Sequence, residues 1–203
     1  MHEQTTTDDS GLGGRLPLLP PAVLDQEQKA IHDGLRATRV RTAASLGYPA
    51  MLPDGQLIGP FNVMLRAPQI AGPLLEWAQA LSRSGIPKDV REVVILTVAA
   101  HWRAKYMLFA HTAAAERIGL SESVIAALRQ GEPSSDLRAE ADVARRLTLA
   151  LVRDRSVPTT LYDEAVSAFG VEMLVALVNL IGQYVNTAAL LTCFRVPAPH
   201  GAA

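Results

Sequence analysis

Cysteine is almost absent from this sequence, which contains Cys193 and no other. An intramolecular disulfide, a redox pair of cysteines and a zinc site built on several cysteines are therefore excluded. A chain with so little cysteine fits a reducing compartment. Residues 1–14 also lack the basic start and the apolar stretch of a signal peptide. We therefore expect a cytoplasmic protein with a disordered N-terminal arm over residues 1–14.

Neither sign of charge is in excess, since 19 lysines and arginines stand against 20 acidic residues. The chain therefore lacks the positive field that nucleic acid or an anionic membrane surface would require, and we expect neither as a partner. Hydrophobic residues make up 49% of the 203 residues and charged residues 19%, which is typical of a globular protein. We expect a single domain over residues 15–197 and a C-terminal tail over residues 198–203.

Strand patterns are missing too, because apolar residues recur three and four positions apart and do not alternate with polar ones. This spacing predicts an all-α fold. Prolines, glycines and capping residues divide the chain into helical segments, separated after the first by a loop over residues 46–59. The predicted segments are a helix opening at Pro21, ranges 60–67, 68–84, 87–119 and 121–131, a helix opening at Ser135 or Asp136, and ranges 158–170 and 171–194.

The last of these segments is the most apolar part of the chain. Polar residues interrupt it and would be costly in lipid, so we interpret it as a buried helix of a soluble protein. Its polar residues form one stripe, which is expected to face solvent, line a ligand pocket or cross a subunit contact. The stripe consists of Glu172, Asn179, Gln183 and Asn186. Cys193, near the end of the segment, is expected to be buried and inert.

The histidines show no metal-binding pattern such as HxxxH or HExxH, so no metal is predicted. His2 and His200 lie in the tails, and His32 lies among charged residues and is expected to be solvated. His101 and His111 remain, and both fall in the 87–119 segment.

His111 has candidate partners for proton chemistry nearby in the sequence. Arg103, Met107 and His111 recur at four-residue intervals on one helix face, and Tyr106 flanks them. Two interpretations stay open: a pocket wall with a proton-transfer histidine, or a boundary histidine bonded to a neighbouring helix.

Glu92 lies in the same segment, where it is expected either to be partly buried with a partner or to pair with Lys88 at the surface. A straight helix would hold Glu92 and His111 roughly 28 Å apart. The two can form an acid–base pair only if the helix breaks, and we predict this break within residues 101–103. Neither glycine nor proline marks a break there.

Four segments in order resemble the carboxymuconolactone decarboxylase family, which shares the fold of alkylhydroperoxidase D. They are GRLPLLPP from Gly14, GPFNVMLRAP from Gly59, REVVILTVAAHWRAKYMLFAH from Arg91 and LVNLIGQYVNTAALLTCFRV ending at Val196. The resemblance implies an alkylhydroperoxidase D-like helical bundle. It also implies that the helix carrying Glu92 ends before the next begins near Arg103.

The resemblance further implies which residues carry the chemistry. In the peroxidase branch a glutamate and a histidine relay protons to two cysteines, and these two acid–base residues match Glu92 and His111. The cysteine positions fall on Ala104 and Met107, so a peroxidase acting through this dithiol is excluded. Relatives without the cysteines carry a Tyr-Glu-Trp run, of which only Tyr106 is retained.

The family residues that this sequence retains resemble the site of a cofactor-free lyase, decarboxylase or isomerase acting on a small unsaturated carboxylate or lactone. Glu92, His111 and Tyr106 are the predicted catalytic residues, and no cofactor is predicted. The alternative is a non-catalytic oligomeric protein that binds ligands or serves as a scaffold. We expect a homo-oligomer, a trimer or hexamer by the resemblance. The predicted substrate-binding residues are Arg103, Met107, Phe61, Asn62 and Trp102.

Overall fold

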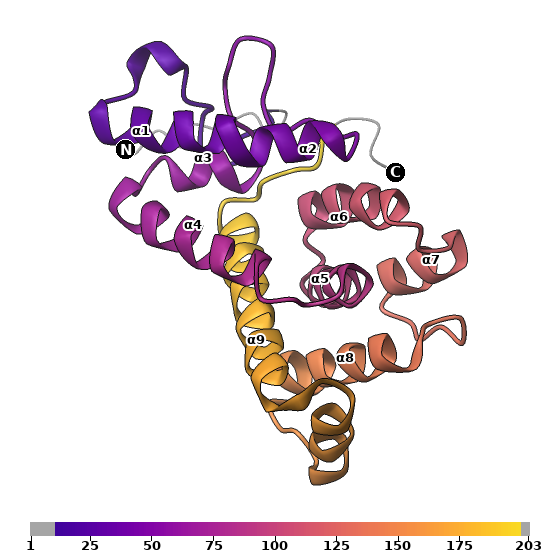
Figure 1. Cartoon of the computed structure of the whole chain (residues 1–203). Helices are drawn as coiled ribbons and strands as arrows, with labels where there is room; N and C mark the ends of the chain where they lie inside the picture. Colours follow the sequence, from indigo (N-terminus) through magenta and orange to yellow (C-terminus); the bar gives the residue numbers. More distant parts are fainter. Residues whose placement is uncertain (1–10, 200–203) are drawn as a thin grey trace, which may run out of the picture.

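The computed structural model describes residues 11–199. Residues 1–10 and 200–203, which hold most of the predicted arm and tail, lie outside the described residues. Over the described range every extended regular element is a helix, apart from an isolated β-bridge between Met51 and Leu57 (Figure 1). The predicted all-α fold is confirmed.

The helices follow the chain order shown in Figure 1. They are α1 (Gln26–Leu35), α2 (Arg41–Ser45), α3 (Pro60–Met64), α4 (Pro68–Ser82), α5 (Lys88–Trp102), α6 (Lys105–Arg117), α7 (Glu122–Gln130), α8 (Ala139–Leu149) and α9 (Thr159–Cys193). A 3-10 turn, Pro21–Val23, precedes α1. Single π-helical turns, Arg36–Val40 and Ala150–Asp154, follow α1 and α8.

Two predicted helix starts are wrong. Pro21 opens only the 3-10 turn, because Asp25 forms a capping box with Gln28 and starts α1 there. Neither Ser135 nor Asp136 caps α8, which begins at Ala139. The carboxylate of Asp136 instead accepts a hydrogen bond from the Ser123 hydroxyl at 2.8 Å. The predicted cap at Ser121 is confirmed by its bond from the Val124 amide.

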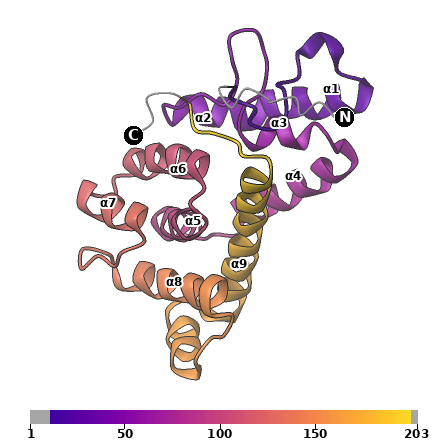
Figure 2. The ribbon, with the colours of Figure 1, turned by 180° about the vertical axis from the view of Figure 1, so that it is seen from behind.

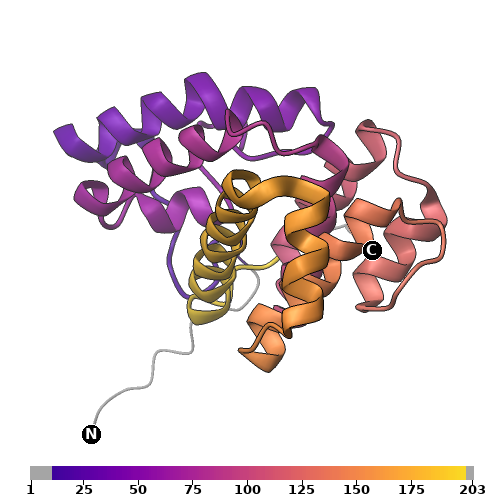
Figure 3. The ribbon, with the colours of Figure 1, turned by 60° about the horizontal axis from the view of Figure 1, so that its bottom comes forward.

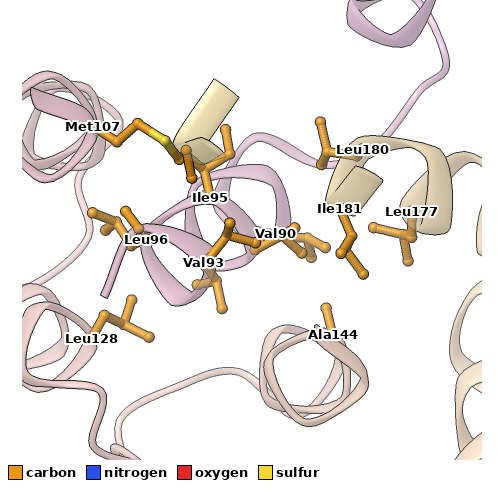
Figure 4. Close-up of a cluster of buried hydrophobic side chains, with 14 of the residues drawn as sticks. Val90, Val93, Ile95, Leu96, Met107, Leu128, Ala144, Leu177, Leu180 and Ile181 are labelled. Atoms are coloured by element: carbon orange, nitrogen blue, oxygen red, sulfur yellow. The ribbon is translucent and has the colours of Figure 1, made fainter. Parts of the chain in front are cut away.

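Helix α5 lies at the centre of the main hydrophobic core. It contacts α6, α7, α8 and α9, which surround it in two opposite views (Figures 1 and 2). Its apolar side chains point toward all four neighbours, as Figure 4 shows for Val90, Val93, Ile95 and Leu96. A helix that is apolar around its whole circumference requires such enclosure. Glu92 lies on this enclosed helix and is itself buried.

Helices α1 to α4 form a second layer, with a smaller apolar cluster of its own around Leu35, Leu57 and Leu65. His32, which was expected to be solvated, is buried in this layer. Its Nε2 lies 2.9 Å from the Gly55 carbonyl oxygen, and its Nδ1 lies 3.3 Å from a carboxylate oxygen of Asp33. The histidine thus fastens the loop over residues 46–59 to α1.

The two ends of the described chain meet at the close of α9. Residues 11–14, which the sequence places in the disordered arm, form a turn in the structure. The amide of Arg15 donates to the Phe194 carbonyl oxygen at 2.8 Å, and the Arg15 guanidinium donates to the Cys193 carbonyl oxygen at 2.9 Å. Residues 11–14 are therefore held against the end of α9 and do not form a disordered arm.

Helix α9 is two helices joined at Gly170, whose φ of 72° and ψ of 164° are not helical. The segments before and after Gly170 do not share one axis (Figure 3). By length and composition alone, α9 is the one candidate for a membrane span among the described residues. The part after Gly170 packs its buried side chains, including Leu177 and Leu180, into the main core (Figure 4). Absence of a membrane partner and the homo-oligomeric state stay predictions.

The predicted break of the 87–119 segment is confirmed at Arg103. This residue ends α5 in the left-handed conformation, with φ 51° and ψ 37°, and α6 starts two residues later. Helix α5 is seen nearly end-on in Figures 1 and 2, and α6 lies across it. The turn at Arg103 therefore brings α6 back against α5.

Arg103→Gly should stabilise the fold by about 0.5–1 kcal/mol, since glycine adopts the left-handed conformation without the steric cost of a Cβ atom. The arginine side chain is exposed. Urea unfolding would measure the effect. Arg129→Gly is the control, because Arg129 is exposed within α7 and glycine there should destabilise by about 1 kcal/mol. Destabilisation by Arg103→Gly would contradict the prediction.

Candidate active site

A pocket of about 250 Å³ lies between the α1–α4 layer and the bundle around α5. Its wall is made by α3, α4, α5, α6, α9 and the chain from the π-helical turn to Tyr48. The predicted residues that line it are Phe61, Glu92, Tyr106, Met107 and His111. The remaining lining residues are Arg39, Thr42, Leu46, Tyr48, Pro60, Met64, Leu74, Leu75, Ala78, Ser82, Arg91, Ala110, Ala114, Gln183, Tyr184, Asn186 and Thr187.

Glu92 and His111 form a hydrogen-bonded pair in this pocket, as predicted. Oε2 of Glu92 lies 2.8 Å from Nδ1 of His111. Glu92 is 8% exposed, and the His111 side chain is 16% exposed. With Glu92 ionised, its carboxylate can only accept, so Nδ1 carries a proton, and in the neutral imidazole Nε2 then has the lone pair. The pair therefore orients a histidine whose free nitrogen can accept a proton from a ligand.

Tyr106 supplies the third predicted catalytic side chain. Its hydroxyl is buried and has no hydrogen-bond partner among the described residues. Burial raises the pKa of this phenol, and the nearby phenol of Tyr48 adds to the shift, so the hydroxyl stays protonated and able to donate. A buried donor without an acceptor costs free energy. A ligand oxygen in the pocket would remove that cost.

Two further tyrosines lie close to the pair. The Tyr184 ring stands edge-on to the His111 imidazole, with centroids 5.1 Å apart and an interplanar angle of 87°. Burial raises the pKa of Tyr184, and the negative charge of Glu92 acts in the same direction. For Tyr48, burial followed by the charge of Glu92 raises the pKa to about 12. All three phenols of the pocket are therefore neutral near pH 7.

Three of the predicted substrate-binding residues lie outside the pocket, and these predictions are wrong. Arg103 is exposed at the turn between α5 and α6. Trp102, one position earlier, packs against the main hydrophobic core. Asn62 is buried, but its side chain binds the backbone of the N-terminal lead-in, accepting from the Leu19 amide at 3.2 Å and donating to the Pro17 carbonyl oxygen at 3.4 Å. Asn62 therefore anchors the N-terminal lead-in and does not line the pocket.

The polar residues of α9 do not share one environment. Gln183 and Asn186 line the pocket, whereas Glu172 and Asn179 are exposed. Other residues that line the pocket were not predicted from the sequence. Among them Arg39 and Arg91 carry charge.

Cys193 was expected to be buried but is exposed. It lies at the last position of α9 and does not line the pocket, because the carboxyl end of the helix points its side chain away from the core. In the described part of the chain, no group of three or more histidine, cysteine, aspartate or glutamate side chains is arranged to hold a metal ion.

No family model and no curated protein matches the sequence, but solved structures share its fold. An uncharacterised peroxidase-related protein from Silicibacter sp. TM1040 is similar at a TM-score of 0.71 and 15% identity, over 98% of this chain and 97% of that one. The alkylhydroperoxidase AhpD core of an uncharacterised peroxidase-related protein from Ralstonia eutropha JMP134 gives 0.70 and 13%, over 93% of each chain.

A third similar structure is a protein of unknown function from Agrobacterium tumefaciens, related by name to AhpD. It gives a TM-score of 0.61 at 15% identity, over 68% of this chain and 96% of that one. Together these likenesses show that the chain has the AhpD-like fold that the four sequence segments imply. At such identities they show the fold alone.

Proposed function

We propose that the pocket is the active site of a cofactor-free enzyme that moves protons at carbon, as a lyase or decarboxylase or as an isomerase. The substrate class is a small unsaturated carboxylate or lactone. The observation that carries the proposal is the hydrogen bond between Glu92 and His111 at the wall of a pocket that Tyr106 also lines, with a buried hydroxyl that has no partner among the described residues. These three groups provide a base, its orienting carboxylate and a donor for an oxyanion.

In the isomerisation, Nε2 of His111 takes a proton from a carbon next to a carbonyl group. The C–H electron pair moves into the carbonyl, whose oxygen becomes an enolate oxygen and accepts a hydrogen bond from Tyr106. Glu92 stabilises the imidazolium formed at His111. Return of the same proton to the conjugated carbon completes the reaction, with no net gain or loss of atoms.

Decarboxylation would use the same groups from the other protonation state. The electron pair of the breaking C–C bond enters the same enolate, carbon dioxide leaves, and the His111 imidazolium protonates the carbon. The two reactions differ in which bond supplies the electron pair and in the protonation state from which His111 starts.

Peroxidase chemistry through a dithiol is not proposed, although two similar structures are named peroxidase-related. The chain has a single cysteine, and Cys193 does not line the pocket. A thiol peroxidase needs a second thiol to resolve the oxidised one.

The proposed function is tested by incubating the protein in D₂O with a panel of unsaturated carboxylic acids and lactones. NMR and mass spectrometry would then detect deuterium gained at carbon and carbon dioxide lost. At least one compound should react, and the reaction should not require added metal or cofactor. A panel in which no compound exchanges, isomerises or loses carbon dioxide would count against an enzyme and favour the ligand-binding alternative.

Tyr106→Phe should separate function from stability. Loss of the oxyanion donor should lower kcat/KM for the reacting compound about 100-fold. The free energy of unfolding should stay the same or rise, because the variant removes a buried hydroxyl that has no partner among the residues described. Turnover and urea unfolding measure the two effects. Full activity, or a large loss of stability, would show that the hydroxyl has another role.

A further inference from the structure

The pocket contains a cation that the Glu92–His111 pair does not use. Arg39 lines the pocket and is half-buried. Among the residues that the structure describes, it has no partner in any hydrogen bond or salt bridge (compare the partners of Arg15, Arg66 and Arg91). Partial burial of an unpaired guanidinium costs desolvation free energy. An anion bound in the pocket would compensate for that cost.

The position of Arg39 depends on the π-helical turn Arg36–Val40 between α1 and α2. Turns of this kind shift the register of the helix and are frequent at functional sites. Arg39 lies within the turn, and Thr42 and Leu46 follow it, so that the three residues line the pocket at spacings of three and four residues. The irregular turn therefore belongs to a segment that presents a guanidinium to the pocket.

The other charges of the pocket do not neutralise Arg39. Glu92 is bonded to His111, and no contact within 4 Å joins it to Arg39. Both nevertheless act on the same two phenols, since the charge of Arg39 lowers the pKa of Tyr48 and Tyr184 while that of Glu92 raises it. The guanidinium of Arg39 and the carboxylate of Glu92 thus both lie near the pocket and are not bonded to each other.

The number of lining cations that lack a hydrogen-bond acceptor indicates the charge of the ligand. The guanidinium of Arg91 donates to the Leu81 carbonyl oxygen at 2.6 Å, which leaves Arg39 as the lining arginine that has no hydrogen-bond acceptor among the described residues. A phosphate dianion would find only one such cation for its two charges, and the negative charge of Glu92 would repel it. A carboxylate carries one charge and matches the two parallel donors of a guanidinium.

From these observations we infer that Arg39 is the carboxylate-binding residue of the pocket, in place of Arg103, and that the ligand is a monocarboxylate. Its apolar body would lie against Phe61, Met64 and Leu75, which line the same space. The inference rests on the proposed function, because that proposal identifies this pocket as the substrate site. It concerns binding alone and does not depend on turnover.

Binding of acids and their neutral amides tests Arg39. The probes are sorbate and trans-cinnamate, each compared with its amide by NMR titration at low ionic strength. The wild-type protein should bind the acids about 10- to 100-fold more tightly than the amides. Arg39→Met should abolish this preference, and Arg39→Lys should keep part of it. Arg39→Gln is a second neutral variant in case methionine disturbs the turn.

Arg41→Met is the matched control, because it removes the same charge from an exposed position of α2 outside the pocket. It should keep the preference for acids. Equal binding of acids and amides by the wild type, a preference that survives in Arg39→Met, or no binding of either acid at millimolar concentration would overturn the inference. An acid preference that depends on Arg39, without turnover of any compound, would support the inference while counting against the proposed enzyme.

Discussion

His111→Asn is expected to lower kcat/KM for the reacting compound by about 10³-fold, because it removes the group that accepts the proton. Asparagine cannot take a proton at neutral pH, but its amide can still donate a hydrogen bond to Glu92. The buried carboxylate therefore keeps a donor in place of Nδ1. Activity should collapse while thermal unfolding changes little, and steady-state kinetics with a melting curve measures both.

His101→Asn is the matched control for His111→Asn. His101 is exposed near the end of α5 and does not line the pocket, so the same chemical change there should leave kcat/KM unaltered. Glu92→Gln should cause a smaller loss than His111→Asn, since glutamine can orient the imidazole but cannot stabilise its charged form. Normal turnover by His111→Asn would mean that another group is the base.

The fold class could be predicted from the sequence because helix periodicity and capping are local properties. The break at Arg103 was different, since neither glycine nor proline lies at that point. A left-handed arginine is unfavourable on its own and persists because α6 must pack against α5. Only the resemblance to a known family supplied this tertiary requirement.

The candidate site was predicted on one side only. Glu92, Tyr106 and His111 stood out because polar groups are unusual within an apolar segment, and the structure places all three in the pocket. The opposite wall was missed, because Arg39 and Tyr48 belong to a segment that was predicted only as a helix opening at Pro21 followed by a loop over residues 46–59. A π-helical turn has no sequence signature, so the face that carries Arg39 could not be assigned from helical spacing.

Errors among the predicted binding residues have a common physical cause. Asn62 follows Phe61 on one helix, and consecutive helical side chains point about 100° apart. Phe61 faces the pocket, so Asn62 faces the N-terminal lead-in instead. Arg103 and Trp102 lie at the turn before α6, where the change of direction carries their side chains away from the face that holds His111.

Gly59→Ala is expected to destabilise the protein by about 3 kcal/mol or more. Gly59 precedes α3 with φ 65° and ψ −145°, a conformation that is essentially restricted to glycine. A Cβ atom there would also lie well inside van der Waals contact of the Tyr106 ring, and overpacking adds to the backbone strain. Urea unfolding should show a lower midpoint with an unchanged slope.

A double-mutant cycle with Tyr106→Ala separates the two causes. Removal of the ring relieves the clash but not the backbone strain, so Gly59→Ala should cost less in the Tyr106→Ala background by about 1 kcal/mol or more. Gly34→Ala is the control, because Gly34 lies within α1 with open space around it and alanine should stabilise that helix by about 0.5–1 kcal/mol. Additive effects in the cycle would show that backbone conformation alone requires glycine at position 59. A coupled result would show that Gly59 is also required to leave room for the Tyr106 ring. The position of the hydroxyl proposed to bind the enolate oxygen would then depend on a residue outside the catalytic set.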